Sequence, residues 1–234
     1  KIAKLNGVSS YSATVSTSAN AKGFDAIETS SSSSQGFGGK MPGGTSETSG
    51  DITVSGVTST ASNSSFSDGS YTITSGRGLK ASDANSENVV IETNLAKSNS
   101  LKVGSTIKLK ATTGSKKTYT LKVVGIYKAK SSATTAMGPG ASDPANTVFT
   151  GTTIANTFKG SKYAGTADSV TFNVSTPSKV ASVKAAAKKL INTSKYSINS
   201  DDASYQRVKS SMKSVTGFAN KIVWLVVIAG TIIL

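Results

Sequence analysis

The sequence contains no cysteine and no histidine among its 234 residues. Without cysteine no disulfide can staple the fold, which fits a domain on the surface of a bacterium that lacks an oxidising periplasm. The two absences together exclude a Ser-His or Cys-His nucleophile and an ordinary zinc site. Hydrophobic residues make up only 36% of the chain, which is enough for a modest core wrapped in polar loops.

Arginine is also scarce: of the 26 basic residues only Arg77 and Arg207 are arginines, and the rest are lysines. Proteins that read nucleic acid favour arginine and stack bases on aromatic side chains, yet aromatic residues are only 6% of this chain. We therefore expect no nucleic-acid partner. The net charge of +14 fits either a lysine-coated surface that faces anionic lipid or wall polymer or a surface adapted only for solubility.

Acidic residues are few, and the 12 carboxylates are scattered, so no pair is placed for glycoside hydrolysis. Ser210–Lys213 matches Ser-x-x-Lys, but the companion motifs of Ser-Lys hydrolases are absent. Gly36–Lys40 resembles a phosphate loop, but Met41-Pro42 replaces the Ser or Thr and the helix start that such a loop needs. Gly76–Gly78 predicts a turn. We expect no catalytic residue, no metal site and no cofactor, and hence a chain that is not an enzyme.

Long apolar runs are missing too, except at the C-terminal end. Residues 222–234 read IVWLVVIAGTIIL without a charge, up to the last residue of the chain. A membrane-spanning helix needs about 20 apolar residues, and Lys221 and Trp224 are residue types that anchor such a helix at the membrane interface. The run predicts the start of a transmembrane helix. The alternative is a buried core element, but no other segment is apolar enough to pack against it.

A helical pattern precedes this run. Apolar residues recur three and four positions apart, as along one face of a helix, at Tyr205, Val208, Met212, Val215 and Ala219. Ser200 or Asp201 can cap the start of the helix, and no proline interrupts it. We expect a stalk helix over residues 201–221 that continues into the membrane and carries mechanical displacement.

The residues before the stalk predict a compact α+β unit. Residues 170–174 alternate as in a half-buried strand, and Tyr196 and Ile198 predict a second strand. Between them Ser178 can cap a helix with apolar residues at 180, 183, 187 and 190.

The N-terminal residues predict strands that belong with this unit. Residues 2–7 have the pattern of a helix end stopped by Asn6-Gly7. Residues 11–15 alternate as in a strand, and residues 24–28 can return as the second strand of a hairpin. A further strand begins at Ile52. The Ser- and Gly-rich residues 30–50 between them have the composition of a loop.

The central residues predict a different, mostly β subdomain. Leu95 and Ala96 are expected to pack from a short helix over residues 94–99. The turn-forming residues 131–146 predict a second long loop. Short strands are expected over residues 89–91, 103–109, 119–126 and 148–149.

Parts of this pattern resemble a known family. Gly76–Leu109, followed by Tyr119–Tyr127, is similar to the extracytoplasmic core domain of MacB-like and FtsX-like ABC transporter permeases. The shared elements are a Gly-Arg-x-Leu turn before an aspartate, a strand leading into Asn-Leu-Ala-Lys, then Val-Gly-Ser-Thr-Ile and Val-Val-Gly-Ile-Tyr. Ile2–Val8 resembles the segment after the family's first transmembrane helix, and the final helix running into Trp224 resembles the entry to its second. The Ser- and Gly-rich loop matches nothing in this pattern.

The resemblance implies an α+β fold in two subdomains. A porter-like split β-α-β unit would consist of residues 1–66 and 166–200, with residues 67–165 inserted as a small β-rich subdomain. The C-terminal helix would enter the membrane. The resemblance also implies a cell-membrane location with the domain on the extracellular face. Its expected partners are a cytoplasmic ATP-binding subunit, a second permease copy in a dimer and a membrane-fusion-like adaptor protein.

The implied function is to couple cytoplasmic ATP hydrolysis to export by mechanotransmission, with peptides, antibiotics or similar molecules as cargo. Two alternatives stay open. One is an FtsX-like regulatory permease that activates a cell-wall hydrolase. The other is a membrane-anchored wall-binding module, which the lysine coat and the Ser/Thr-rich composition would suit.

Overall fold

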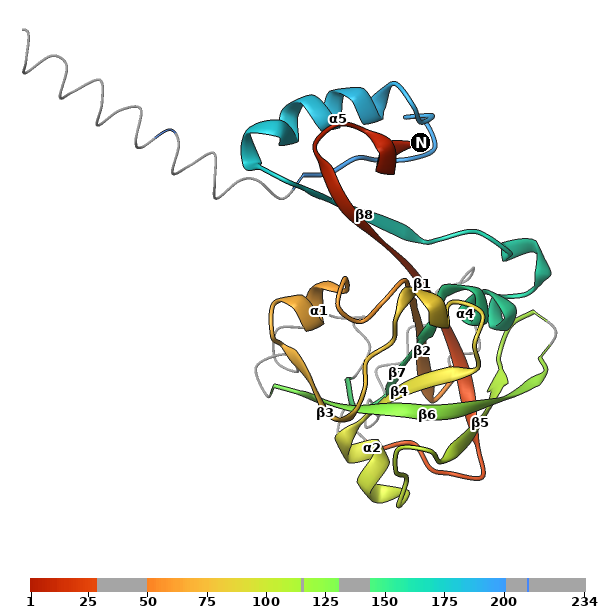
Figure 1. Cartoon of the computed structure of the whole chain (residues 1–234). Coiled ribbons are helices and arrows are strands. Elements are labelled where there is room, and N and C mark those ends of the chain that lie inside the picture. The colour runs from red at the N-terminus through yellow and green to blue at the C-terminus, as the bar shows by residue number, and fades with distance from the viewer. Residues whose placement is uncertain (29–49, 115, 131–143, 201–209, 211–234) are drawn as a thin grey trace, which may run out of the picture. The chain divides into compact units, whose positions relative to one another are not determined.

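The computed structural model describes residues 1–28, 50–114, 116–130, 144–200 and 210. Contacts divide the chain into a larger unit, Ser12–Thr171, and a smaller unit made of Lys1–Tyr11 and the residues from Phe172 onward. The strands and α-helices follow in this order (Figure 1): β1 Val8–Lys22, β2 Ile52–Val57, α1 Ser64–Ser67, β3 Tyr71–Gly76, β4 Asn88–Glu92, α2 Thr93–Ser98, β5 Thr106–Ala111, β6 Thr118–Ala129, β7 Thr147–Gly151, α4 Thr152–Lys159, β8 Ser169–Val174 and α5 Val180–Lys188.

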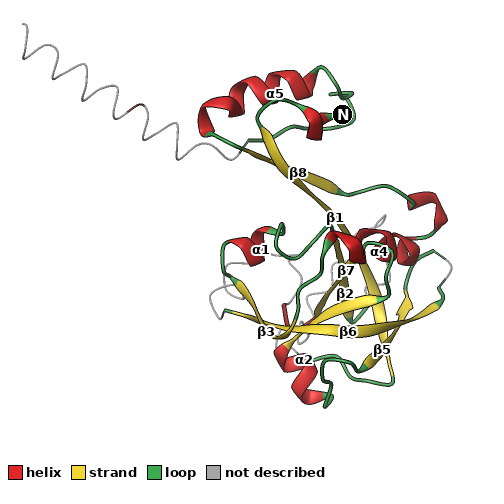
Figure 2. Ribbon diagram, in the orientation of Figure 1, coloured by secondary structure: helices red, strands yellow, loops and turns green. Residues whose placement is uncertain are grey.

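In the larger unit the strands form a mixed sheet that closes on itself (Figure 2). The strand order is β2-β7-β4-β6-β5-β1-β8, and β1 pairs again with β2, so that the first six of these strands form a ring. The β2–β7 and β4–β6 pairs are parallel, whereas β1–β2, β1–β5, β4–β7 and β5–β6 are antiparallel. Closure pairs the edges that an open sheet would expose. β3 pairs with the second half of β6, antiparallel to it.

The ring encloses the main core. β5 illustrates how the strands of the ring are oriented. Its buried residues Ile107, Leu109 and Ala111 alternate with the exposed Lys108 and Lys110. Successive side chains of a strand point to opposite faces, so this pattern fixes which side is buried. Every strand of the ring contributes to the main cluster, together with α2 and α4: Val15, Ala19, Ile52, Val54, Val89, Ile91, Leu95, Ala96, Ile107, Leu109, Ala111, Leu121, Val123, Val148, Ala155 and Phe158.

A second, aromatic cluster lies on the opposite side of β4, where Val90 takes part instead of Val89 and Ile91. It holds α1 and β3 against the sheet through the rings of Phe66, Tyr71, Tyr127 and Phe149, whose centroids lie between 5.0 and 6.1 Å apart. The hydroxyl of the fully buried Tyr127 donates to the carbonyl oxygen of Pro144 at 2.8 Å, so its polar end is satisfied.

The smaller unit has α5 as its main element. Val183 and Ala187 of α5 are buried, and Gly7, which has a positive φ of 100°, lies against Val183. A Cβ on Gly7 would come within 3.0 Å of the Lys179 side chain and 3.2 Å of Val183. The ring of Tyr11 packs against that of Phe172 at 6.2 Å.

Several sequence predictions are confirmed. Strands occupy the predicted positions around residues 11–15, 52, 89–91, 119–126, 148–149 and 170–174, and β5 covers most of residues 103–109. The short helix over residues 94–99 is α2, in which Leu95 and Ala96 are buried as expected. The turn at Asn6-Gly7 follows a short 3-10 helix, Ile2–Lys4. The fold is a mixed, sheet-dominated one, in agreement with the α+β class.

Three local predictions are wrong. Residues 24–28 do not return as a hairpin strand, because β1 continues to Lys22 and pairs through Ala19–Lys22 with β5. Residues 195–200 contain no strand, and Tyr196 is 64% exposed. Ser178 does not cap α5; a 3-10 turn, Pro177–Lys179, leads into the helix, and no side chain caps it. β3 and α4 were not predicted.

The expected subdomain boundaries differ from the compact units. Residues 12–66, expected in the discontinuous unit, lie in the larger unit with residues 67–165. The reason is β2, which pairs with β7 across a separation that sequence patterns do not reveal. The smaller unit is still built from both ends of the described chain.

The predicted stalk and membrane segment fall outside the described residues. This applies to residues 201–209 and 211–234 and to most of the two predicted loops at 30–50 and 131–146. Among the residues that are described, no helix combines the length and the apolar character needed to cross a membrane.

Candidate functional site

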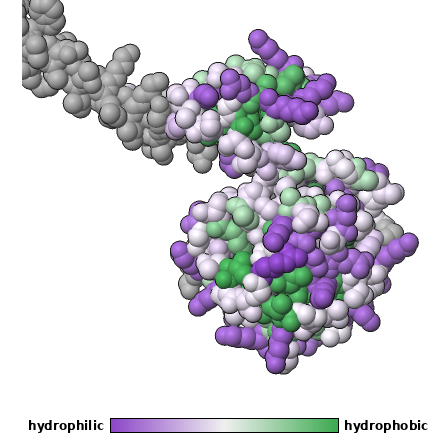
Figure 3. All heavy atoms as spheres, in the orientation of Figure 1, coloured by the Kyte–Doolittle hydropathy of each residue, from purple (hydrophilic) through white to green (hydrophobic). Residues whose placement is uncertain are grey.

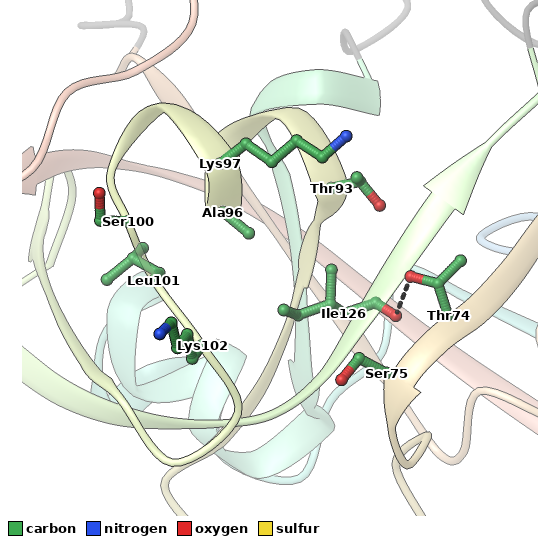
Figure 4. Close-up of a pocket in the computed structure, with 9 residues that line it drawn as sticks. All are labelled: Thr74, Ser75, Thr93, Ala96, Lys97, Ser100, Leu101, Lys102 and Ile126. Atoms are coloured by element: carbon green, nitrogen blue, oxygen red, sulfur yellow. Dashed lines mark hydrogen bonds between the residues drawn. The ribbon is translucent and has the colours of Figure 1, made fainter.

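An open pocket of ≈ 470 Å³ lies in the larger unit at the C-terminal end of α2 (Figure 4). Ile126 of β6 lies at its centre, with Thr74 and Ser75 of β3 on one side and residues 100–102 on the other. The pocket exists because β3, α2 and β6 meet here. Its lining consists of Thr74, Ser75, Thr93, Ala96, Lys97, Ser100, Leu101, Lys102 and Ile126.

The end of α2 shapes one wall of the pocket. The Ser100 N–H donates to the carbonyl oxygen of Lys97 at 3.1 Å, and the Leu101 N–H donates to that of Ala96 at 2.8 Å. These two bonds form a Schellman motif, whose central residue adopts a left-handed conformation and is usually glycine. Here Ser100 occupies that position with a φ of 52°, so the pocket wall carries a hydroxyl group that glycine would not supply.

The start of α2 is held by a buried carboxylate. Glu92 is 2% exposed, and its side chain accepts from the Asn94 N–H as the N-cap of α2. Burial raises the pKa of Glu92 above its usual value, while the bonds from backbone N–H groups at the helix start oppose this shift. The carboxylate is therefore engaged at the start of the helix, and Glu92 is not among the residues that line the pocket.

The polar groups of the pocket fall into two sets. The hydroxyl of Thr74 donates to the carbonyl oxygen of Ile126 at 3.2 Å (dashed in Figure 4), and that of Thr93 donates to the carbonyl of Tyr127 at 2.8 Å. Other polar side chains of the lining have no hydrogen-bond partner within the described residues: Ser75, Lys97, Ser100 and Lys102.

The lining suits an amphipathic anion. Ala96, Leu101 and Ile126 give it an apolar surface, and the two lysines supply the only charges among its residues. Pockets that bind small molecules combine an apolar lining with a few polar groups in this way. No group of three or more His, Cys, Asp or Glu side chains that could hold a metal ion occurs in the described part of the chain.

The Gly-Arg-x-Leu segment begins at the last residue of β3, Gly76, and its arginine has a structural role. The Arg77 guanidinium donates to both carboxylate oxygens of Asp83, at 2.6 and 3.0 Å. Asp83 also accepts from the Lys80 N–H and the Asn88 side chain, each at 2.8 Å. The Arg77 bonds, and then the other two donors, hold the pKa of Asp83 far below its usual value despite its burial. Arg77 is thus engaged within the fold. The turn predicted at residues 76–78 is wrong, because Gly76 is the last residue of β3 and the Arg77 N–H still donates to the Val124 carbonyl of β6 at 2.9 Å.

A second, larger pocket of ≈ 630 Å³ opens between the end of β5 and α4 and includes Lys117, Lys159 and Lys162. Its charges are partly neutralised within the larger unit, because Lys159 pairs with Asp168 at 2.6 Å. The hydroxyl of Tyr119 donates to the Thr157 carbonyl at 3.0 Å. This pocket has less unpaired charge for its size than the pocket beside α2.

The structure does not test the site residues that the sequence predicted. The stalk positions Tyr205, Val208, Met212, Val215 and Ala219 lie outside the described residues, as do Lys221 and Trp224 at the predicted membrane interface. The pocket beside α2 was not predicted. Lys97 belongs to the Asn-Leu-Ala-Lys motif, but no sequence signal placed β3 next to α2.

Comparison with known proteins decides the family. The profile of the MacB-like periplasmic core domain matches residues 5–190 of this chain. The chain belongs to the MacB-like periplasmic core domain family. The resemblance that the Gly-Arg-x-Leu, Asn-Leu-Ala-Lys and Val-Val-Gly-Ile-Tyr segments indicated is therefore confirmed.

Individual relatives of this MacB-like domain agree. It is 38% identical over 248 aligned positions to the uncharacterized ABC transporter permease YclI of Bacillus subtilis (strain 168), covering 100% of this chain and 51% of YclI. The chain thus spans about half the length of that relative. A Gram-positive source for the chain is consistent with this match.

Two solved structures resemble the fold. The extracellular domain of the noncanonic ABC-type transporter YknZ from Gram-positive bacteria superposes with a TM-score of 0.50 at 15% identity, over 82% of this chain and 79% of that one. The periplasmic region of MacB from Actinobacillus actinomycetemcomitans gives a TM-score of 0.45 at 15% identity, over 81% and 70%. The YknZ likeness supports the fold alone.

Proposed function

We propose that the chain is the extracellular domain of an ABC transporter permease subunit that relays ATP-driven motion to drive export. The observation that carries the proposal is the 38% identity to the permease YclI over the whole of this chain. Identity at this level supports a shared role. Peptides, antibiotics or similar molecules are the proposed cargo, and the domain itself catalyses no reaction.

The proposal gives the domain a location and partners. The domain lies on the extracellular face of the cell membrane. A cytoplasmic ATP-binding subunit supplies the energy, a second permease copy completes a dimer, and an adaptor protein of the membrane-fusion type receives the cargo. The 38% identity to the ABC transporter permease YclI supports this location.

The connections between the two units suit a mechanical relay. The chain passes from one unit to the other at residues 11–12 and 171–172, and both positions lie inside strands, β1 and β8. Strands that continue through a boundary transmit a pull along the chain more stiffly than loops do. The proposed stalk helix, residues 201–221, would deliver the displacement to the smaller unit.

The test uses the full-length permease with its ATP-binding subunit. Val208→Pro removes a helical hydrogen bond and kinks a helix, at a cost of about 3 kcal/mol. We expect transport to be lost while ATP hydrolysis continues in part, because the motor would no longer be coupled to the domain. Val208→Ala is the matched control, since it trims the same side chain without breaking a helix. A proline variant that transports as well as the alanine variant would rule out the relay.

The MacB-like family match favours a transporter over the FtsX-like regulatory permease. A regulatory permease would bind a cell-wall hydrolase, and a pull-down with the full-length permease from solubilised membranes would reveal that partner. Retention of a hydrolase together with unchanged cargo levels in a deletion strain would replace export with regulation as the function.

A further inference from the structure

The smaller unit is cationic to an unusual degree. Its described residues, 1–11 and 172–200, contain no aspartate and no glutamate. The larger unit, in contrast, carries acidic residues such as Asp83 and Asp168. Asp201 and Asp202 follow directly in the sequence, outside the described residues. The lysines of the smaller unit are Lys1, Lys4, Lys179, Lys184, Lys188, Lys189 and Lys195.

The charge is combined with exposed apolar side chains at one place, residues 188–196, which we call the α5-end patch. Lys188, Lys189 and Lys195 are exposed, and between and beside them Leu190 is 44% and Tyr196 64% exposed. In Figure 3, hydrophilic spheres gather at the end of the smaller unit where Figure 1 places the N-terminus and the C-terminal end of α5.

Contacts within the part of the chain that the structure describes do not account for the patch. The ion pairs among the described residues, Arg77–Asp83 and Lys159–Asp168, both lie in the larger unit. Lys188 and Lys189 are stabilised by the negative, C-terminal end of the α5 dipole. This interaction does not explain Lys195 or the exposure of the Leu190 and Tyr196 side chains.

We propose that the α5-end patch binds the headgroup layer of a bilayer that contains anionic phospholipid. Lysines near an anionic membrane surface are attracted to it additively, and tyrosine is enriched at the depth of the headgroups. A leucine beside them can enter the boundary between headgroups and acyl chains. These two apolar side chains favour a lipid surface over a soluble polyanion, which would leave both in water. The proposal does not depend on transport.

The test measures co-flotation of the full chain with vesicles of phosphatidylcholine alone or mixed with phosphatidylglycerol. The patch variant is Lys188→Gln/Lys189→Gln/Lys195→Gln. The matched control is Lys108→Gln/Lys110→Gln/Lys122→Gln, which removes the same charge from exposed positions on β5 and β6. We expect the patch variant to bind anionic vesicles about tenfold or more weakly than the control variant. Residues 222–234 are unchanged throughout, so any insertion of that apolar run contributes equally.

A second variant, Leu190→Ser/Tyr196→Ser, separates a bilayer from a soluble polyanion. It should lose vesicle binding, most clearly at high salt where the lysine attraction is screened, and should bind soluble polyphosphate as the wild type does. The proposal is overturned if the two lysine variants lose binding equally, if phosphatidylcholine vesicles bind as well as anionic ones, or if the Leu190/Tyr196 variant binds vesicles like the wild type. Matching circular dichroism spectra would show that every variant is folded.

Discussion

At the scale of single residues, Asp83 is the clearest example of a buried charge whose cost of burial is offset by the groups around it. Its side chain is nearly inaccessible and is surrounded by the Arg77 guanidinium, the Lys80 N–H and the Asn88 amide. An isolated buried carboxylate is costly, and here the donors compensate for that cost. The segment after β3 is therefore held by the Arg77–Asp83 ion pair and by the two further donors to Asp83, while Thr74 and Ser75 of β3 itself line the pocket.

Asp83→Asn should lower the free energy of unfolding by about 1–3 kcal/mol at neutral pH, because Arg77 would lose a charged partner. In the folded chain the pKa of Asp83 lies below its ordinary value of 3.8. The Asp83 carboxylate therefore contributes its full stabilisation above pH 3.8, and this stabilisation is lost as the pH falls further. Urea denaturation at a series of pH values should show the difference between wild type and variant shrinking below about pH 4.

Glu87→Gln is the control for this prediction, since it removes one negative charge from an exposed position close by in sequence. It should leave stability almost unchanged at every pH. An Asp83 variant that behaves like the Glu87 variant would show that the Arg77–Asp83 pair contributes nothing.

Ser100 offers a second prediction at this scale. Left-handed backbone costs a non-glycine residue roughly 1–2 kcal/mol, partly offset in a Gly variant by the entropy of the unfolded chain. Ser100→Gly should thus raise the free energy of unfolding by about 0.5–1 kcal/mol, measured by thermal or urea denaturation. Ser98→Gly, inside α2, should have the opposite sign because glycine weakens helices. If both substitutions changed the free energy of unfolding in the same direction, the left-handed backbone at Ser100 would not be strained.

The sequence predicted some of these residues and not others. The packing of Leu95 and Ala96 follows from the helical spacing of α2. The turn predicted from the glycines at residues 76–78 does not form, because β3 extends to Gly76 and Arg77 still bonds to β6. Two features could not be inferred from the sequence: the ion pair between Arg77 and Asp83, and the position of the pocket lysines in the lining. Both depend on where β3 lies. β3 was missed since Tyr71 and Ile73 alternate over too short a stretch to stand out among the surrounding polar residues.

At the scale of elements, the packing of α4 on β2 depends on the absence of one side chain. A Cβ on Gly56 would lie 2.5 Å from the Cβ of Ala155 and 3.1 Å from the Cα of Thr152. The helix therefore approaches the strand at a distance that only glycine allows. Phe158 of the same helix is fully buried, so a displaced α4 would also disturb the main core.

Gly56→Ala should lower the free energy of unfolding by about 1–3 kcal/mol through overpacking. In a double-mutant cycle, Ala155→Gly should recover part of this loss because it removes the nearest clashing atom, while the Thr152 backbone still crowds the site. Additive effects of the two substitutions in urea denaturation would show that α4 and β2 are not in such close contact.

Elements with local signals were predictable and those set by distant partners were not. β4, β6 and β7 have apolar or alternating residues of their own. β1, in contrast, is rich in serine and alanine and extends to Lys22 because it pairs with both β2 and β5 at Ala19. Propensity alone predicts a turn there. α4 begins with two threonines and contains Ile154, residues that are typical of strands, and only its place against the ring makes it a helix.

At the scale of the whole molecule, the two units are unequally stabilised. Both hydrophobic clusters lie in the larger unit, whereas the buried apolar residues among the described part of the smaller unit are Val183 and Ala187. Regions with few buried contacts open locally at a lower free energy than the core. A unit that opens easily is suited to follow the motion of an attached helix, as the proposed relay requires.

Native-state hydrogen exchange tests this inequality. Amides of α5 should exchange through openings of much lower free energy than those of β4 and β6. Val183→Ala removes two buried methyl-sized groups at about 0.8 kcal/mol each, so it should speed exchange in α5 and leave β4 and β6 unchanged. Leu121→Ala, at a fully buried position of the ring, should cost about 2–5 kcal/mol and speed exchange throughout the larger unit. If Val183→Ala instead destabilised β4 and β6 as much as α5, the units would unfold as one, and the smaller unit would be too firmly held to move separately during transport.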